Sequence, residues 1–131
     1  MSMTYNVRQA GMATVVDLSG RIGLREPTAS GSASSGVLHE LIRDLVGHGH
    51  KKILLNLRDV TSVDSSGIGE LFGSFTTVRN QGGVLKLTHP NERVQNVIRL
   101  TKLDTVVELI QDEATALRSF SKEEEKRVLG A

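Results

Sequence analysis

The stretch that decides the fold runs from residue 53 to residue 69 and reads ILLNLRDVTSVDSSGIG. Its first part, at 53–57, has apolar residues at both odd and even positions. A short run with this pattern is typical of a central strand that is covered on both faces. The Asp-Ser-Ser-Gly sequence at 64–67 then opens a segment with apolar residues at helical spacing. The stretch therefore predicts a buried strand, a short connection and a helix.

The rest of the chain continues this alternation. Apolar and polar residues alternate loosely at 4–10 and 13–18, which predicts two strands. A turn at Gly11 would join them into an antiparallel hairpin that ends at residues 19–20. The periodicity of the apolar residues predicts helices at 37–46, 68–78, 91–98 and 112–120, and strands at 84–87 and 106–110.

Strands that alternate with helices indicate a largely parallel sheet. We therefore predict one α/β domain at 1–120, with a mixed, mostly parallel sheet of about five strands and about four helices that cover mainly one face. Val37 and Phe72 belong to the apolar stripes of their helices and are expected to be buried. Residues 121–131 are predicted to form a charged C-terminal tail.

Composition narrows the classes of function. The chain has 131 residues, enough for one domain, and a formal net charge of +1, too close to neutral for a dedicated binder of nucleic acid or membrane surfaces. It has no cysteine, which excludes disulfides, thiolate metal sites and cysteine nucleophiles. No apolar run approaches the roughly 20 residues that span a bilayer. We expect a cytoplasmic protein without a cofactor.

The polar residues at 64–67 are the candidates for chemistry. A serine-hydrolase elbow requires glycine two residues before and two after the nucleophile, and neither Ser65 nor Ser66 satisfies this pattern. A dinucleotide fingerprint requires Gly-x-Gly-x-x-Gly, whereas Gly67 and Gly69 are followed by Gly73, one position late. Both interpretations are weak, and we expect that the protein is not an enzyme.

Two interpretations of the same residues remain. Asp64, Ser65 and Ser66 can simply cap the helix, which from the residues alone is the simpler interpretation. Alternatively, Ser65 is a phosphorylation switch, because a phosphate adds roughly −1.5 to −2 charges that a docked partner would have to desolvate. The backbone N–H groups of a helix N-terminus could tolerate that phosphate, so the domain itself would not need to refold.

His48 and His50 are the only closely spaced imidazoles. They lie at a predicted helix end flanked by Gly47 and Gly49, with no carboxylate at a recognisable spacing. We expect them to cap the helix in solvent and to bind no metal ion.

The run at 53–57, followed by Val60 and the Asp-Ser-Ser-Gly-Ile-Gly sequence at 64–69, resembles the signature of STAS domains. Within that family the chain most resembles the anti-sigma factor antagonists. The glycine pair at 82–83 and the Val-Ile-Arg-Leu-Thr sequence at 97–101 match the family pattern in order, so the resemblance covers about residues 4–120. It favours the switch over the simple cap.

The resemblance implies a bacterial signalling cycle. The unphosphorylated protein would bind an anti-sigma factor that is also a serine kinase, which frees a sigma factor to direct transcription. The kinase would phosphorylate Ser65, with Ser66 as the alternative, and a metal-dependent serine phosphatase would reset the protein. Asp64 would orient the loop, and Gly67 would let the kinase approach the backbone closely.

The chain departs from the family pattern where the second strand ends. Many members have an acidic residue soon after the glycine at this position, whereas here Gly20 is followed by Arg21, and the loop at 23–36 is long and rich in serine. We expect Gly20, Arg21 and the start of the helix, with Ile68, to contribute to the partner surface. The departure leaves open a constitutive role as a STAS scaffold or as a subunit of a larger complex, such as a stress-signalling assembly or a lipid-transport ATPase. A nucleotide-binding domain that uses the Gly67–Gly73 turn is a third alternative.

Overall fold

The computed structural model describes residues 3–23 and 36–129 of the chain, and side chains as far as residue 121. The predicted long loop therefore lies outside the described residues, apart from its ends at Gly23 and Gly36. The strands are β1 (Thr4–Ala10), β2 (Ala13–Ile22), β3 (Lys52–Val63), β4 (Val84–Thr88) and β5 (Glu108–Ile110). The helices are α1 (Val37–Gly47), α2 (Ser65–Asn80), α3 (Glu92–Leu100), the short 3-10 helix η1 (Leu103–Thr105) and α4 (Glu113–Leu129).

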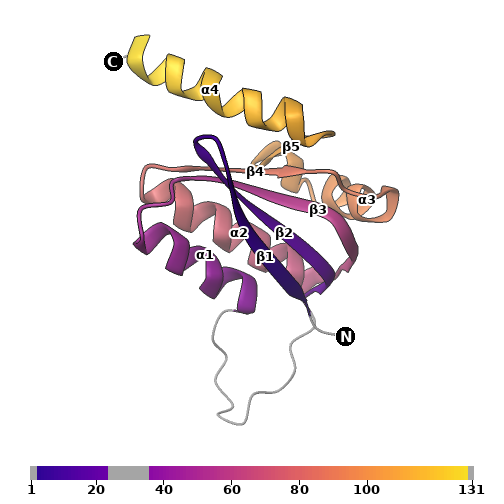
Figure 1. Ribbon diagram of the computed structural model, residues 1–131. Coiled ribbons are helices and arrows are strands. Elements are labelled where there is room, and N and C mark those ends of the chain that lie inside the picture. Colours follow the sequence, from indigo (N-terminus) through magenta and orange to yellow (C-terminus); the bar gives the residue numbers. More distant parts are fainter. Residues whose placement is uncertain (1–2, 24–35, 130–131) are drawn as a thin grey trace.

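The five strands form one sheet in the order β1-β2-β3-β4-β5 (Figure 1). The β1–β2 pair is antiparallel, and the other three pairs are parallel. This confirms the predicted mixed sheet with an N-terminal hairpin. Because the connections between parallel strands contain helices, the carboxyl ends of β2 and β3 lie at the same edge of the sheet.

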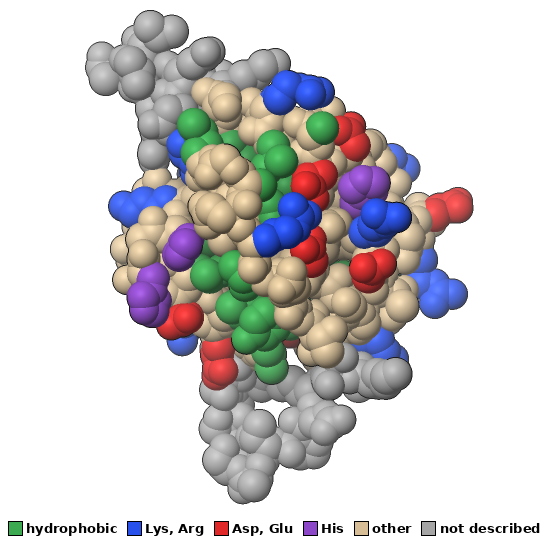
Figure 2. All heavy atoms as spheres, in the orientation of Figure 1, with side chains coloured by type: hydrophobic (Ala, Val, Ile, Leu, Met, Phe, Trp, Pro, Cys, Tyr) green, Lys and Arg blue, Asp and Glu red, His purple; other side chains and the backbone are tan. Residues whose placement is uncertain are grey.

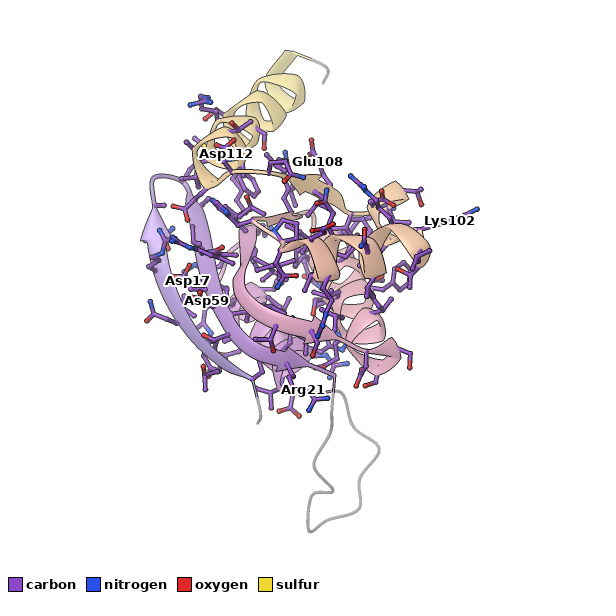
Figure 3. The ribbon with its side chains drawn as sticks, turned by 90° about the vertical axis from the view of Figure 1, so that its right-hand side faces the viewer. Asp17, Arg21, Asp59, Lys102, Glu108 and Asp112 are labelled. Carbon is purple, nitrogen blue, oxygen red and sulfur yellow. The ribbon has the colours of Figure 1, made fainter. Side chains whose placement is uncertain are left out.

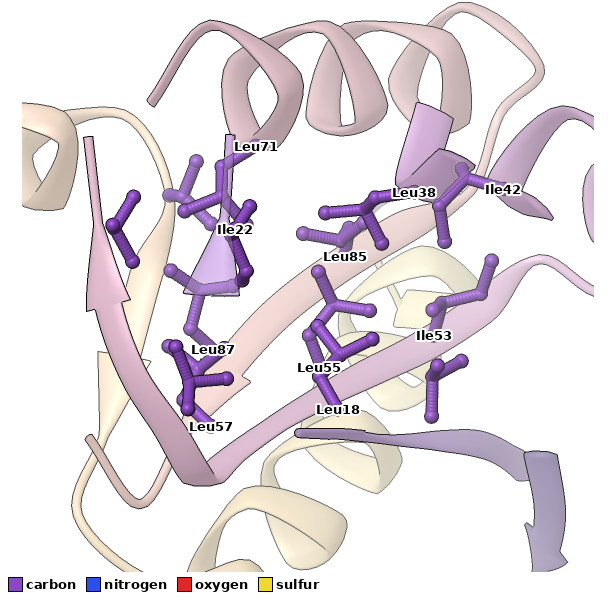
Figure 4. Packing of buried hydrophobic residues seen from close by; sticks show 14 of the residues in the cluster. Leu18, Ile22, Leu38, Ile42, Ile53, Leu55, Leu57, Leu71, Leu85 and Leu87 are labelled. Carbon is purple, nitrogen blue, oxygen red and sulfur yellow. The ribbon is translucent and has the colours of Figure 1, made fainter. Parts of the chain in front are cut away.

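The larger part of the core lies between the sheet and the helices α1, α2 and α3. Leu38 and Ile42 of α1 and Leu71 of α2 face apolar side chains of the strands (Figure 4). A smaller cluster on the other face of the sheet packs Ala116 and Phe120 of α4 against the strands. The helical cover is therefore mainly on one face, as predicted, and α4 covers part of the other face (Figure 1).

The two strands that lead to the candidate site are longer than predicted. Instead of ending at residues 19–20, β2 continues to Ile22 and pairs with β3 as far as Val63. The pairing shifts register between Asp17 and Ser19 and again between Gly20 and Arg21. At each shift β3 has one residue more than β2 between the paired positions, as in a β-bulge. Gly20 has a φ of +90°, which is unfavourable for a residue with a side chain. The extension brings the end of β2 beside the start of α2.

Two apolar residues are not buried as predicted. Val37 and Phe72 are 57% and 49% exposed, although both belong to apolar stripes in the sequence. Val37 is the first residue of α1, and Phe72 lies on the side of α2 that faces away from the sheet. In α4 Ala116 is buried, whereas Ala114 is exposed. The helix also continues past residue 120 to Leu129, and the division of the chain at that residue stays a prediction.

Candidate functional site

Helix α2 begins directly beyond the carboxyl end of β3. Asp64, with an extended backbone, is its N-cap, and its Oδ1 atom accepts a hydrogen bond of 2.9 Å from the backbone N–H of Gly67. This bond satisfies one of the N–H groups that a helix leaves free in its first turn. The predicted cap is confirmed, and Asp64 alone provides it.

The two neighbouring serines differ in their hydrogen bonds. The Ser66 hydroxyl lies 2.6 Å from the Gly23 carbonyl oxygen and 2.7 Å from Asp64 Oδ1, so its single proton is shared between two acceptors. Ser65 is the first residue of α2 and is exposed, and none of the described residues forms a hydrogen bond with its hydroxyl. The Ser65 hydroxyl is therefore available at the surface, whereas the Ser66 hydroxyl is engaged within the domain.

The carboxylate of Asp64 is held in its charged form. Partial burial alone would raise the pKa of Asp64, but hydrogen bonds from Ser66 and Gly67, together with the charge of Arg21, outweigh that effect and hold the pKa below its usual value. A negative charge at the first turn of a helix is also favoured by the helix dipole. The cap therefore places a permanent negative charge beside Ser65 at neutral pH.

The end of β2 forms the other side of the site. The backbone N–H of Asp64 donates to the Ile22 carbonyl at 3.3 Å, and the Thr61 hydroxyl donates to the Gly20 carbonyl at 3.1 Å. Arg21 is exposed at this end of the sheet, away from Glu108 and Asp112 (Figure 3). The structure thus brings the predicted residues Gly20 and Arg21 to the start of α2.

Two glycines in the site are required for packing. A Cβ atom on Gly67 would lie 2.3 Å from the carbonyl oxygen of Ile22, and Gly67 is buried. The Ile22 carbonyl of β2 therefore lies where a side chain at position 67 would be, and the expectation that Gly67 lets a kinase approach the backbone closely stays a prediction. A Cβ atom on Gly23 would lie 1.9 Å from Asp64 Oδ1. Sequence reasoning missed this role of Gly23, since it depends on a residue 41 positions further along the chain.

The remaining predicted residue, Ile68, is half-buried and packs against the larger core cluster. It lies one turn into α2, beside the exposed start of the helix. Its side chain is therefore shared between the interior and the surface next to Ser65.

The arrangement of glycines does not favour a nucleotide site. Gly67, Gly69 and Gly73 all lie inside α2, and Gly73 packs against the imidazole of His39. A phosphate-binding glycine loop lies before the helix, where its N–H groups can converge on the phosphate. Here a single residue, Asp64, separates β3 from α2.

The histidines at 48 and 50 have separate partners. His48 is the C-cap residue of α1, and its Nδ1 atom lies 2.8 Å from the Asp44 carbonyl oxygen. His50 Nδ1 lies 2.8 Å from the hydroxyl of Thr14 in β2. Among the described side chains, no group of three or more His, Asp or Glu residues could hold a metal ion.

The surface carries both signs of charge. Figure 2 shows Lys and Arg side chains interspersed with Asp and Glu on the face that it presents. Arg8 of β1 donates to Asp17 at 2.8 Å and also contacts Glu113 at the start of α4. In the part of the chain that the structure describes, no helix is both long and apolar enough to span a bilayer.

Comparisons with known proteins agree with this architecture. A Thermotoga maritima protein named as an anti-sigma factor antagonist is 32% identical over 79 residues, which are 60% of this chain and 70% of the relative. The anti-sigma-B factor antagonist of Bacillus subtilis is 29% identical over 109 residues, which are 83% of this chain and 92% of the relative.

Solved structures share the fold. An anti-sigma factor antagonist from Mycobacterium paratuberculosis has a TM-score of 0.72 and 22% identity, covering 90% of this chain and 93% of the other. The Bacillus cell fate determinant SpoIIAA in its phosphorylated form has a TM-score of 0.57 and 17% identity, covering 88% and 99%. A family model described as the STAS domain matches residues 29–116, well over half of the chain. The chain belongs to the STAS domain family.

Proposed function

We propose that this protein is an anti-sigma factor antagonist whose binding to an anti-sigma factor is switched off by phosphorylation of Ser65. The observation that carries the proposal is the exposed hydroxyl of Ser65 at the first position of α2, which forms no hydrogen bond with any described residue, next to a Ser66 hydroxyl that is already hydrogen-bonded. The relatives named as anti-sigma factor antagonists support the class of partner. The phosphorylated form of SpoIIAA supports phosphate as the signal.

The predicted chemistry is a phosphoryl transfer from ATP. The Ser65 oxygen attacks the γ-phosphorus of ATP, ADP leaves, and a base of the kinase takes the hydroxyl proton. The partner is therefore an anti-sigma factor with serine kinase activity, and a metal-dependent serine phosphatase would hydrolyse the phosphoserine. Since ATP and sigma factors are found inside the cell, the cycle places the protein in the cytoplasm.

The switch acts on the surface and leaves the fold intact. A phosphate at Ser65 would add about −1.5 to −2 charges beside the carboxylate of Asp64. The N–H groups of the first turn of α2 and the nearby Arg21 would offset part of this charge within the domain. A partner that covers Ser65 would have to desolvate the phosphate, and like-charge repulsion from Asp64 would add to that cost. The partner is therefore released while the domain stays folded.

The experiment that tests the proposal is intact-mass measurement after incubation with ATP and cytosol from the native host. The wild type and Ser66→Ala should each gain one phosphate, and Ser65→Ala should gain none. Circular dichroism of each variant controls for loss of folding. A phosphate on Ser65→Ala but not on Ser66→Ala would move the site to Ser66. Absence of phosphate on every variant would refute the switch and favour constitutive binding as a STAS scaffold or subunit.

A further inference from the structure

Strand β1 lies at one edge of the sheet, and β5 lies at the other (Figure 1). All seven residues of β1, Thr4–Ala10, pair with β2 without a register shift. Within the described part of the chain, no strand pairs with the other side of β1. That side of its backbone is therefore open, and an open edge is where a further strand can add to a sheet.

The geometry of the β1–β2 hairpin decides which backbone groups point outward. Ala10 pairs with Ala13 across a two-residue turn that Gly11 begins with a φ of +62°. The pair that closes such a turn is hydrogen-bonded, because the other antiparallel pattern would need a bond between the two adjacent turn residues. Bonded and non-bonded pairs then alternate, so the residues at 4, 6, 8 and 10 bond to β2. The residues whose N–H and C=O groups point away from β2 are Tyr5, Val7 and Gln9.

Strand β1 lacks the features that usually prevent strand addition. Those features are a very short strand, a proline, a bulge or a free charged side chain at the edge. The opposite edge strand, β5, has only three residues, whereas β1 has seven and contains no proline. The single charged residue of β1 is Arg8, whose guanidinium already contacts Asp17 and Glu113. The outer edge of β1 is therefore suited to pairing with another strand.

The same residues that point their backbone groups outward also expose apolar side chains. Tyr5 and Val7 lie opposite Leu18 and Val16 of β2, which belong to the larger core cluster. Residues directly opposite each other share a face of the sheet, so Tyr5 and Val7 lie on the face that α1, α2 and α3 cover. They are nevertheless 49% and 38% exposed. A strand added beside β1 would cover part of this exposed area.

We propose that β1 pairs with β1 of a second copy of this chain, antiparallel about a two-fold axis at Val7. In this register Val7 lies opposite Val7 of the second copy, and Tyr5 lies opposite Gln9. This is the one antiparallel register in which all seven residues of β1 are paired. The three outward-pointing residues of each copy then form three bonded pairs with about six hydrogen bonds, two for each pair. The two sheets become one continuous sheet.

The side chains of β1 are complementary to a second copy in this register. On one face, the Val7 side chains of the two copies meet, and each Tyr5 reaches the opposite Val7 on the diagonal. On the other face, Arg8 lies opposite Asn6, so no two charges of the same sign meet. A slip of two residues would either place Arg8 opposite Arg8 or leave the end of β1 unpaired, and like charges directly opposite each other are destabilising. The inference uses no residue of the candidate site and is independent of the proposed function.

Sedimentation equilibrium of the purified protein tests the dimer. One pair of strands makes a small interface, so we expect a dissociation constant on the order of 100 μM. Val7→Lys should raise this constant by about 10-fold or more, because the two lysines would face each other across the axis. Val106→Lys is the matched control: Val106 is 44% exposed, it lies beside β5 at the opposite edge of the sheet, and its replacement should leave the constant unchanged. Circular dichroism checks that each variant is folded.

A mixture of two variants tests the register. Val7→Glu alone should also weaken self-association, since two carboxylates would meet at the axis. An equal mixture of Val7→Glu and Val7→Lys should associate at least as tightly as the wild type, because opposite charges would then face each other. A mixture that associates no more tightly than either variant alone would overturn the pairing of Val7 with Val7.

An introduced thiol provides an independent measurement, because the chain has no cysteine. The Cα atoms of a hydrogen-bonded antiparallel pair lie about 5.5 Å apart, within the range of a disulfide. Under mild oxidation Val7→Cys should form a linked dimer on non-reducing electrophoresis, and Val106→Cys should link far more slowly. A wild type that stays monomeric at about 1 mM, ten times the expected dissociation constant, would overturn the proposal. A dimer that Val7→Lys leaves unchanged, or linkage of Val7→Cys no faster than that of Val106→Cys, would assign self-association to another surface.

Discussion

Gly67 and Gly69 lie two residues apart on α2, and the same added methyl group should have opposite effects at the two positions. A Cβ atom on Gly67 would lie 2.3 Å from the Ile22 carbonyl oxygen and 2.8 Å from its carbonyl carbon. These are backbone atoms, which cannot rotate away as the end of a side chain can. A Cβ atom on Gly69 would meet no atom of the described residues within 4 Å. The pair therefore tests the packing of β2 against the start of α2.

The size of each effect follows from the structure. Forcing a methyl group into a packed site costs about 1–3 kcal/mol, and the rigid carbonyl places Gly67→Ala at the upper end of that range. Displacing Ile22 would also weaken the hydrogen bond that its carbonyl accepts from Asp64, worth about 1 kcal/mol. Alanine returns at most about 1 kcal/mol through its helix propensity. We expect Gly67→Ala to lower the free energy of unfolding by about 3 kcal/mol, and Gly69→Ala to raise it by about 0.5–1 kcal/mol.

Urea unfolding followed by circular dichroism measures both variants against the wild type. With a slope of about 1.5 kcal/mol per molar urea, Gly67→Ala should move the midpoint down by about 2 M, and Gly69→Ala should move it up by about 0.5 M. Equal midpoints for Gly67→Ala and the wild type would refute the close approach of β2 to α2. Destabilisation by Gly69→Ala would refute the open space around Gly69.

Three further predictions concern a cap residue of α2, a buried lysine of β4 and a cap residue of α3. The pKa of Asp64 is lower in the folded protein than its ordinary value of 3.8, so its contribution to stability is complete above that pH and is lost as the pH falls through the folded value. Asp64→Asn should therefore lower the free energy of unfolding at pH 7, and the loss should shrink as the pH falls below 3.8. Urea unfolding over a series of pH values measures this, and a loss that does not change with pH would contradict it. Lys86 is 2% exposed, with its Nζ 5.0 Å from the centre of the Phe120 ring. Lys86→Met should change the free energy of unfolding by less than about 1 kcal/mol, whereas Lys86→Ala should lower it by about 3 kcal/mol. Equal losses for the two variants in urea unfolding would show that stability depends on the charge of Lys86 rather than on its packing. Asn91 caps α3 and donates to the Val60 carbonyl at 2.9 Å. Asn91→Ala should lower the free energy of unfolding by about 2 kcal/mol and therefore lower the melting temperature. An unchanged melting temperature in calorimetry would contradict the cap and the hydrogen bond to Val60.

Much of the fold could be predicted because its signals are local. The continuous apolar run at 53–57 marked the central strand, and helical spacing marked the four helices, since the period of the apolar residues follows directly from backbone geometry. The cap at Asp64 was also predictable, because the acceptor and its donor Gly67 are three residues apart. Exposure was harder to predict: Phe72 matches an apolar stripe in the sequence, but only the position of α2 on the sheet decides which side of the helix faces solvent.

The sequence by itself determined the alternation of strands and helices, the cap of α2 and the pair of candidate hydroxyls at Ser65 and Ser66. Only the tertiary structure shows that those hydroxyls differ in their hydrogen bonds, because Ser66 donates to the Gly23 carbonyl, 43 residues earlier in the chain. The role of Gly67 was decided in the same way by Ile22. Both contacts depend on the register shifts that carry β2 beyond Gly20 to the start of α2. Local residue patterns specify periodicity and caps, whereas contacts between distant segments depend on how the strands pair.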